Sequence, residues 1–99
     1  MSKIFEVEFE KKVKLQKPKK FKVYLINDNQ TTMDFVVDVL INIFKKAPID
    51  ANQLMLDIHN KGRGLCGIYS YEIAKTKEIE VKQYAKAEGF PLKATIEEE

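Results

Sequence analysis

The 99 residues are 44% hydrophobic and 32% charged with a net charge of +2, which allows one small domain with one main surface site and excludes a deep, multi-part active site. There is no run of about 18 apolar residues and no basic-then-apolar N-terminus, so we expect neither a membrane span nor export. One histidine and one cysteine cannot form a four-ligand zinc site or an internal disulfide, so we expect no metal and a reducing, cytoplasmic setting.

Residues 1–20 carry seven lysines against three glutamates, which is typical of a flexible extension. We therefore expect a folded domain at residues 21–99 and a flexible N-terminal extension at residues 1–20. Within the extension, residues 4–10 alternate over their second half and could form a strand at a free sheet edge. The domain itself carries a slight negative charge, which argues against nucleic-acid binding.

Residues 21–26 are β-branched and aromatic and predict a strand. Six polar residues follow at 27–32, more than a turn requires. Residues 32–46 then predict a helix whose polar positions recur every three to four residues, which indicates a central helix covered on more than one side. Thr31 or Thr32 should cap it, with Asp34 in its first turn.

Pro48 interrupts the chain, and Asp50 followed by Gln53 resembles a capping box that opens a second helix, which Gly62 should end in a left-handed conformation. Residues 65–69 predict a second strand. Ser70 should cap a third helix that runs to residue 88 and ends at Gly89, and residues 92–97 predict the last strand. The predicted class is α+β: a three-stranded antiparallel sheet covered by three helices, in the order β-α-α-β-α-β.

Two sequence patterns resemble those of enzymes but lack the context that enzymes require. Gly62, Gly64 and Gly67 spell GxGxxG, but they lead from a helix into a strand, the reverse of a dinucleotide site. His59 and Cys66 lack an orienting third group at recognisable spacing, which argues against nucleophilic catalysis. We therefore expect that the protein is not an enzyme and binds no cofactor.

Met33 and Val36 share one helical face by their spacing, as do Met55 and Ile58. These residues are either ordinary core or, because methionine adapts its shape, the walls of a pocket for a bulky apolar group. Residues of the polar crossing and the single histidine would then stand at its rim.

Asn27, Asp28 and His59 together offer a carbonyl oxygen, a carboxylate and a neutral imidazole. Acceptors without a compensating cation suit an ammonium group, and the first residue of a peptide carries an ammonium and a side chain on one carbon. The alternative for His59 is an ordinary half-buried histidine bonded to a neighbour.

Three separated stretches resemble ClpS, the bacterial adaptor family that recognises N-degrons and delivers them to the ClpAP protease. They are residues 23–36 (VYLINDNQTTMDFV), residues 53–62 (QLMLDIHNKG), and Cys66-Gly67 followed by residues 72–77 (EIAKTK). The resemblance covers about residues 21–96 in unbroken order.

The resemblance implies a role for each matching position. Asn27, Asp28 and His59 would hold the substrate ammonium. The side-chain pocket would comprise Thr31, Met33, Val36, Met55, Ile58 and Leu92. Met33 would act as a gatekeeper against β-branched first residues, leaving Phe, Leu, Tyr and Trp as ligands. Glu72 and Lys77 would contact the N-terminal domain of a ClpA-like or ClpC-like AAA+ unfoldase, with the chain acting as a monomer and its extension needed for handing over substrate.

Two positions depart from the family pattern. Asn29 stands where a second aspartate is common, and Thr32 replaces a common proline at the helix start. Two other functions stay open: a docking domain that modulates a Clp unfoldase without binding N-termini, and RNA binding through the lysine-rich extension.

Overall fold

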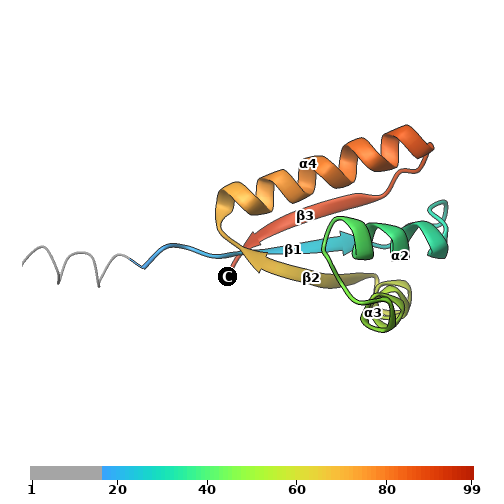
Figure 1. The fold of residues 1–99 in the computed structure, drawn as a ribbon, viewed down its shortest axis with the longest axis horizontal. Helices are drawn as coiled ribbons and strands as arrows, with labels where there is room; N and C mark the ends of the chain where they lie inside the picture. Colours follow the sequence, from blue (N-terminus) through green and yellow to red (C-terminus); the bar gives the residue numbers. More distant parts are fainter. Residues whose placement is uncertain (1–16) are drawn as a thin grey trace, which may run out of the picture.

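The computed structural model describes residues 17–99. In chain order it contains β1 (Phe21–Ile26), α2 (Met33–Asn42), α3 (Pro48–Lys61), β2 (Arg63–Tyr69), α4 (Tyr71–Glu88) and β3 (Lys93–Glu98) (Figure 1). The predicted α+β class, with the order β-α-α-β-α-β and an antiparallel sheet, is confirmed. Most of the predicted flexible extension, and all of the candidate strand at residues 4–10, lie outside the described residues.

The sheet has the order β2-β1-β3, so β1 is the central strand and both of its neighbours run antiparallel to it. Val23 and Leu25 are completely buried, whereas the residues that alternate with them in β1 are only half-buried. One face of the sheet therefore carries the core and the other is partly open, as expected when helices cover a single face.

The ladder between β1 and β2 contains a bulge. Val23 is opposite Gly67 and Tyr24 is opposite Leu65, which leaves Cys66 as the extra residue. The side chain of Tyr69 folds over Gly67 so closely that a Cβ there would collide with its phenol ring. This close approach explains why glycine stands beside the bulge.

The helix α2 ends earlier than predicted, at Asn42 instead of residue 46. Lys45 takes a left-handed conformation with φ 58°, and the N–H of Lys46 donates to the carbonyl of Leu40 at 3.0 Å. This bond spans one residue more than the six-to-one bond of a Schellman motif, so the last turn of the helix is widened, and lysine takes the left-handed position that glycine usually takes. The Lys45 ammonium also donates to the Asn42 carbonyl at 2.7 Å, which satisfies another group of the last turn.

The predicted caps had mixed outcomes. Thr32 caps α2, accepting from the Phe35 N–H at 3.2 Å, and Gly62 and Gly89 end their helices with φ of 91° and 80° as predicted. The capping box at Asp50 is wrong: α3 begins at Pro48, whose fixed φ suits the first helical position. Gln53 instead donates to Asp57 at 3.2 Å, one turn further along.

Ser70 is the N-cap residue of α4, but its side chain makes no capping hydrogen bond, so the predicted role of its hydroxyl is also wrong.

The expectation that α2 is central matches the packing on both of its sides. Toward α4, the ring of Phe35 lies 4.8 Å from those of Tyr84 and Phe90. The Lys77 ammonium, also from α4, donates to the Ile43 carbonyl at 2.7 Å just after α2 ends. On its other side α2 packs directly against α3. It therefore joins the other two helices over the sheet (Figure 1).

No helix between residues 17 and 99 is both long and apolar enough to cross a membrane.

Candidate functional site

A cavity of about 300 Å³ opens where the central strand β1 ends, between the following loop, the first turns of α2 and the C-terminal half of α3. Eight predicted site residues meet there, although they come from three segments of the chain. The lining residues are Asn27, Asp28, Asn29, Thr31, Met33, Val36, Met55, Ile58 and His59.

The walls of the cavity are apolar. Val36 and Ile58 belong to the core, with exposures of 7% and 1%, while Met55 is half-buried against it. Met33 is 44% exposed, so its flexible side chain stands at the mouth and not in the floor. Both of the earlier interpretations of these residues therefore hold in part, because the cavity is the open end of the core itself.

Gly64 sets how closely α3 approaches the sheet beneath this cavity. A Cβ built on Gly64 would lie 2.6 Å from Cγ1 of Ile58 and 3.0 Å from Cδ1 of Leu54. Both neighbours belong to α3, and Ile58 lines the cavity. The absence of a side chain in β2 thus fixes the position of one cavity wall.

Asp28 organises the loop of the site. Its Oδ1 accepts from the Gln30 N–H at 2.8 Å and from the Thr31 N–H at 2.6 Å, while its Oδ2 accepts from the Thr31 hydroxyl at 2.7 Å. Partial burial is the largest single influence and raises the pKa of Asp28, but these hydrogen bonds together outweigh it and hold the pKa below its ordinary value. The carboxylate is therefore ionised at neutral pH and fixed in place.

Asn27 ties this loop to the end of α3. Its backbone N–H donates to the Gly62 carbonyl at 2.8 Å, and its side-chain Nδ2 makes a longer contact, 3.5 Å, with the His59 carbonyl. This orientation of the amide uses its nitrogen within the protein and leaves Oδ1 as the acceptor.

The His59 side chain is exposed at the rim, unlike the half-buried histidine of the alternative interpretation. The lining includes neither lysine nor arginine. The mouth thus combines a carboxylate, an amide oxygen and an imidazole above apolar walls, which is a set of acceptors for a cationic donor attached to an apolar group.

The Cys66 thiol does not take part in this site. It is 1% exposed and contacts the Gly64 carbonyl at 3.5 Å. Burial raises the pKa of Cys66 to about 12, so the thiolate that a nucleophile requires is not formed at neutral pH. Among residues 17–99 there is also no group of three His, Cys, Asp or Glu side chains placed to hold a metal ion.

Leu92 is the predicted pocket residue that the structure does not bring into this cavity. It is 5% exposed and borders a different hollow, between α4 and β3. It directly precedes Lys93, which pairs with Ile26 at the end of β1, so it lies at the same end of the sheet as the site. Its role against a ligand stays a prediction.

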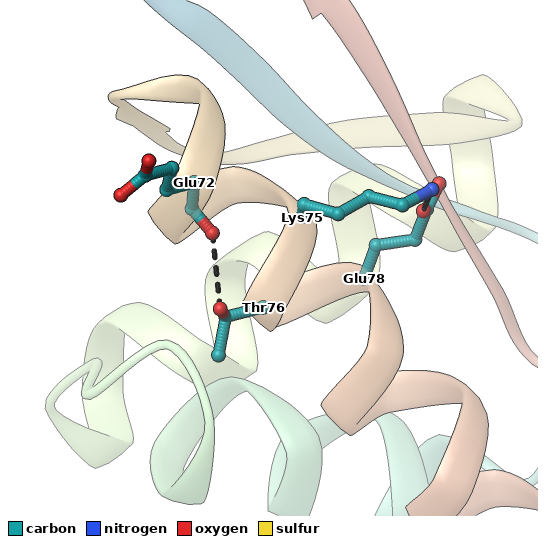
Figure 2. A network of polar contacts seen from close by, with 4 residues as sticks. All are labelled: Glu72, Lys75, Thr76 and Glu78. Atoms are coloured by element: carbon teal, nitrogen blue, oxygen red, sulfur yellow. Dashed lines mark hydrogen bonds and ion pairs between the residues drawn. The ribbon is translucent and has the colours of Figure 1, made fainter.

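Glu72 and Lys77 lie in the first half of α4, apart from the cavity (Figure 2 shows Glu72). The Glu72 carboxylate is exposed and points away from the helix, while its backbone carbonyl accepts from the Thr76 hydroxyl at 3.0 Å. Lys77 is half-buried, and its ammonium, bonded to the Ile43 carbonyl, lies 6.0 Å from the centre of the Tyr69 ring. Sequence reasoning missed this internal contact, since nothing local to Lys77 indicates it.

Asn29 is the one lining residue that sequence reasoning noted only as a departure from the family pattern. Its position beside Asn27 and Asp28 was the available signal.

The comparisons with known proteins agree with one another. The family model "ATP-dependent Clp protease adaptor protein ClpS" matches residues 16–95. Relatives named ATP-dependent Clp protease adapter protein ClpS include that of Wolinella succinogenes, 50% identical over 95% of this chain and 92% of its own length. That of Clostridium acetobutylicum is 47% identical over 95% and 93%.

Among solved structures, Agrobacterium tumefaciens ClpS2 bound to L-phenylalaninamide is similar with a TM-score of 0.81 and 35% identity, covering 84% of this chain and 100% of the other. This chain belongs to the ClpS family of Clp protease adaptors.

Proposed function

We propose that this protein binds other proteins by a free N-terminal residue that is large and apolar, namely Leu, Phe, Tyr or Trp. It then delivers them in the cytoplasm to a ClpA-like or ClpC-like AAA+ unfoldase for degradation. The observation that carries the proposal is the cavity, which places Asn27, Asp28 and His59 at the mouth of apolar walls. It acts as a monomeric adaptor through residues 21–99 and performs no covalent chemistry.

The size of the cavity supports one amino-acid side chain as its occupant. At about 300 Å³ it lies at the lower end of ligand pockets, which run from about 300 to 1,000 Å³. The related ClpS2 structure holds L-phenylalaninamide, a compound in which a free amino group and a benzyl side chain share one carbon. The same two groups match the two halves of the present site.

Each polar residue at the cavity mouth has a task in this proposal. The Asp28 carboxylate, held by Thr31 and Gln30, provides the negative charge, and Asn27 Oδ1 and the neutral His59 ring accept the remaining ammonium protons. Because the loop bonds fix the carboxylate before a ligand arrives, little ordering is needed on binding.

The experiment that tests binding is a fluorescence-anisotropy titration with a labelled peptide that begins with free Leu or Phe, alongside the same peptide acetylated at its N-terminus. We expect tight binding of the free form alone. Asp28→Asn should weaken it strongly, whereas Asp50→Asn, an exposed aspartate in the first turn of α3, should not. Equal binding of both peptides, or of neither, would instead favour a docking domain that does not bind N-termini.

Delivery is tested separately, by titrating the N-terminal domain of a Clp unfoldase. Glu72→Ala should weaken this interaction without lowering the melting temperature, because its carboxylate is exposed and forms no hydrogen bond or ion pair within residues 17–99. Lys77→Ala should lower both the affinity for the unfoldase domain and the melting temperature, because it also removes the bond to the Ile43 carbonyl. Glu80→Ala, on an exposed position of the same helix, is the matched control and should change neither.

A further inference from the structure

A second and larger hollow, which we call the α4–β3 groove, lies between α4 and the start of β3. Its volume is about 540 Å³, and it shares no lining residue with the candidate site. The floor is apolar: Leu92 and Ala94 are buried, and Ile79 is 44% exposed toward it. An apolar hollow of this size on a small domain is a candidate binding surface.

The rim of the groove is strongly basic. Four lysines line it, at positions 75, 82, 86 and 93, against the single carboxylate of Glu78. Lys75 is paired with Glu78 at 2.6 Å, and both side chains extend from α4 toward β3 (Figure 2). Within residues 17–99 the other three lysines form no ion pair, so the rim has positive charge that no described carboxylate neutralises.

The chain enters the described structure near the first turn of α4, at the end of the sheet opposite the start of β3. The Glu99 N–H donates to the Lys20 carbonyl at 2.8 Å, and Lys19 lies 3.6 Å from Glu98. Residues 17–20 therefore run beside the end of β3, close to where α4 begins (Figure 1). Lys75, one turn into α4, is the groove residue nearest to this end of the molecule.

The sequence that precedes Lys17 includes a segment with matching chemistry. Residues 5–10 read Phe-Glu-Val-Glu-Phe-Glu, with three carboxylates and no cation. In an extended backbone this alternation puts the apolar side chains on one side and the carboxylates on the other. Such a segment matches a groove with an apolar floor and a lysine rim.

The connecting chain is long enough. Seven residues separate Glu10, the last residue of that segment, from position 17, and an extended chain spans about 23 Å over that number. The helical distance from Lys75 to Lys86, which measures the groove along α4, is only about 16 Å.

We propose that residues 5–10 dock in the α4–β3 groove of the same molecule. Phe5, Val7 and Phe9 pack on the floor beside Ile79, and the three glutamates face Lys82, Lys86 and Lys93. The tether supplies a high effective concentration, so modest contacts suffice for occupancy. The contact is salt-dependent because its charged half is exposed.

The test uses the full chain with a nitroxide attached through Ser2→Cys, since the buried Cys66 stays unlabelled in the folded protein. We expect selective loss of NMR signal intensity at the amides of Ile79, Lys82 and Lys86, and none at Leu56 on α3. Lys82→Glu with Lys86→Glu should restore those signals. Adding Glu6→Lys, Glu8→Lys and Glu10→Lys to that variant should bring the loss back.

The matched control is Lys22→Glu with Lys61→Glu, which makes the same charge change away from the groove and should leave the signal loss intact. Three results would overturn the proposal: no selective loss in the parent chain, a loss that survives reversal of Lys82 and Lys86, or a loss seen only when spin-labelled and isotope-labelled molecules are mixed. The last result would place the segment on a second copy of the chain.

Discussion

Asp28 performs a structural task, and in the proposed function a binding task, with the same two oxygens. Sequence reasoning treated its polar surroundings as too rich for a turn, and the structure shows that much of this richness builds the turn, through Thr31 and Gln30. The same bonds lower the pKa of Asp28, so its carboxylate stays charged at pH values where an ordinary aspartate becomes protonated. The charge that the proposed ligand requires is thus maintained by the loop that carries it.

Peptide binding should depend on pH because the mouth of the cavity contains both Asp28 and His59. As the pH falls from 7.5 to 5.5, Asp28 stays ionised because its pKa is depressed, whereas histidine is the side chain whose ordinary change of charge falls in this range. A protonated ring cannot accept from an ammonium and repels it, so affinity should fall over this interval. Anisotropy titrations across the interval measure the effect, and His59→Gln should flatten it; an unchanged slope in that variant would remove His59 from the ammonium site.

Met33 provides a second prediction at this scale. Its side chain stands at the cavity mouth with 44% exposure, so shortening it opens space for branching at the Cβ of a ligand. Met33→Ala should therefore admit peptides that begin with Ile or Val, measured by competition against a labelled Leu peptide. Leu56→Ala, with a similarly exposed apolar residue on α3, is the control. Continued rejection of Ile and Val by Met33→Ala would place the gate elsewhere.

At the scale of elements, sequence predicted those boundaries that depend on local chemistry. The strand at residues 21–26 and the helix ends at Gly62 and Gly89 were correct because β-branched patterns and glycine conformations are properties of neighbouring residues. The end of α2 was missed because a lysine, not a glycine, turns the chain there. The bulge at Cys66 was missed because it depends on how two distant strands align.

The candidate site was predictable to a similar extent. Eight of its residues were predicted, seven of them by residue pattern before the family resemblance added Thr31 and completed the assignment of roles. What the pattern could not supply is the tie between Asn27 and the end of α3, or the placement of Leu92 in another hollow. Both depend on three-dimensional packing.

Gly64→Ala tests the contact between β2 and α3. The new methyl group would overlap Ile58, so α3 must move, and we expect a loss of about 1–3 kcal/mol in the free energy of unfolding. Because Ile58 also lines the cavity, peptide affinity should fall as well.

Gly62→Ala is the comparison for that variant. Its φ of 91° disfavours alanine by roughly 1–2 kcal/mol, yet no atom lies within 4 Å of the added methyl group. Denaturation should show both variants destabilised, while the folded fraction of Gly62→Ala should bind more nearly as the parent does. Equal affinity losses in the two would mean that Gly64 acts only through stability.

At the scale of the whole molecule, one core under three helices holds the sheet, and Cys66 lies within it. Burial raises the pKa of this thiol to about 12, so both access and ionisation protect it in the folded state. Its reaction with a thiol reagent therefore reports opening of the core.

We expect Cys66 to resist a thiol reagent at neutral pH and to react rapidly in denaturant. Leu40→Ala removes a completely buried side chain and should cost about 2–5 kcal/mol, so it should speed labelling under native conditions in proportion to the increase in open molecules. Labelling as fast in the native parent as in denaturant would contradict the burial of this thiol. Ile49→Ala, at an 80% exposed position, should leave the rate unchanged.

The bond from the Asn27 N–H to the Gly62 carbonyl joins the loop of the site to the end of the helix that supplies its opposite wall. If that helix end frays, this bond breaks and the polar mouth separates from the apolar wall, so we expect the proposed binding site to be lost as one unit. A damaged or heated preparation should then show fewer competent binding sites per molecule while the remaining sites keep their full selectivity. Partial unfolding would therefore reduce the number of binding-competent molecules before it reduced their selectivity.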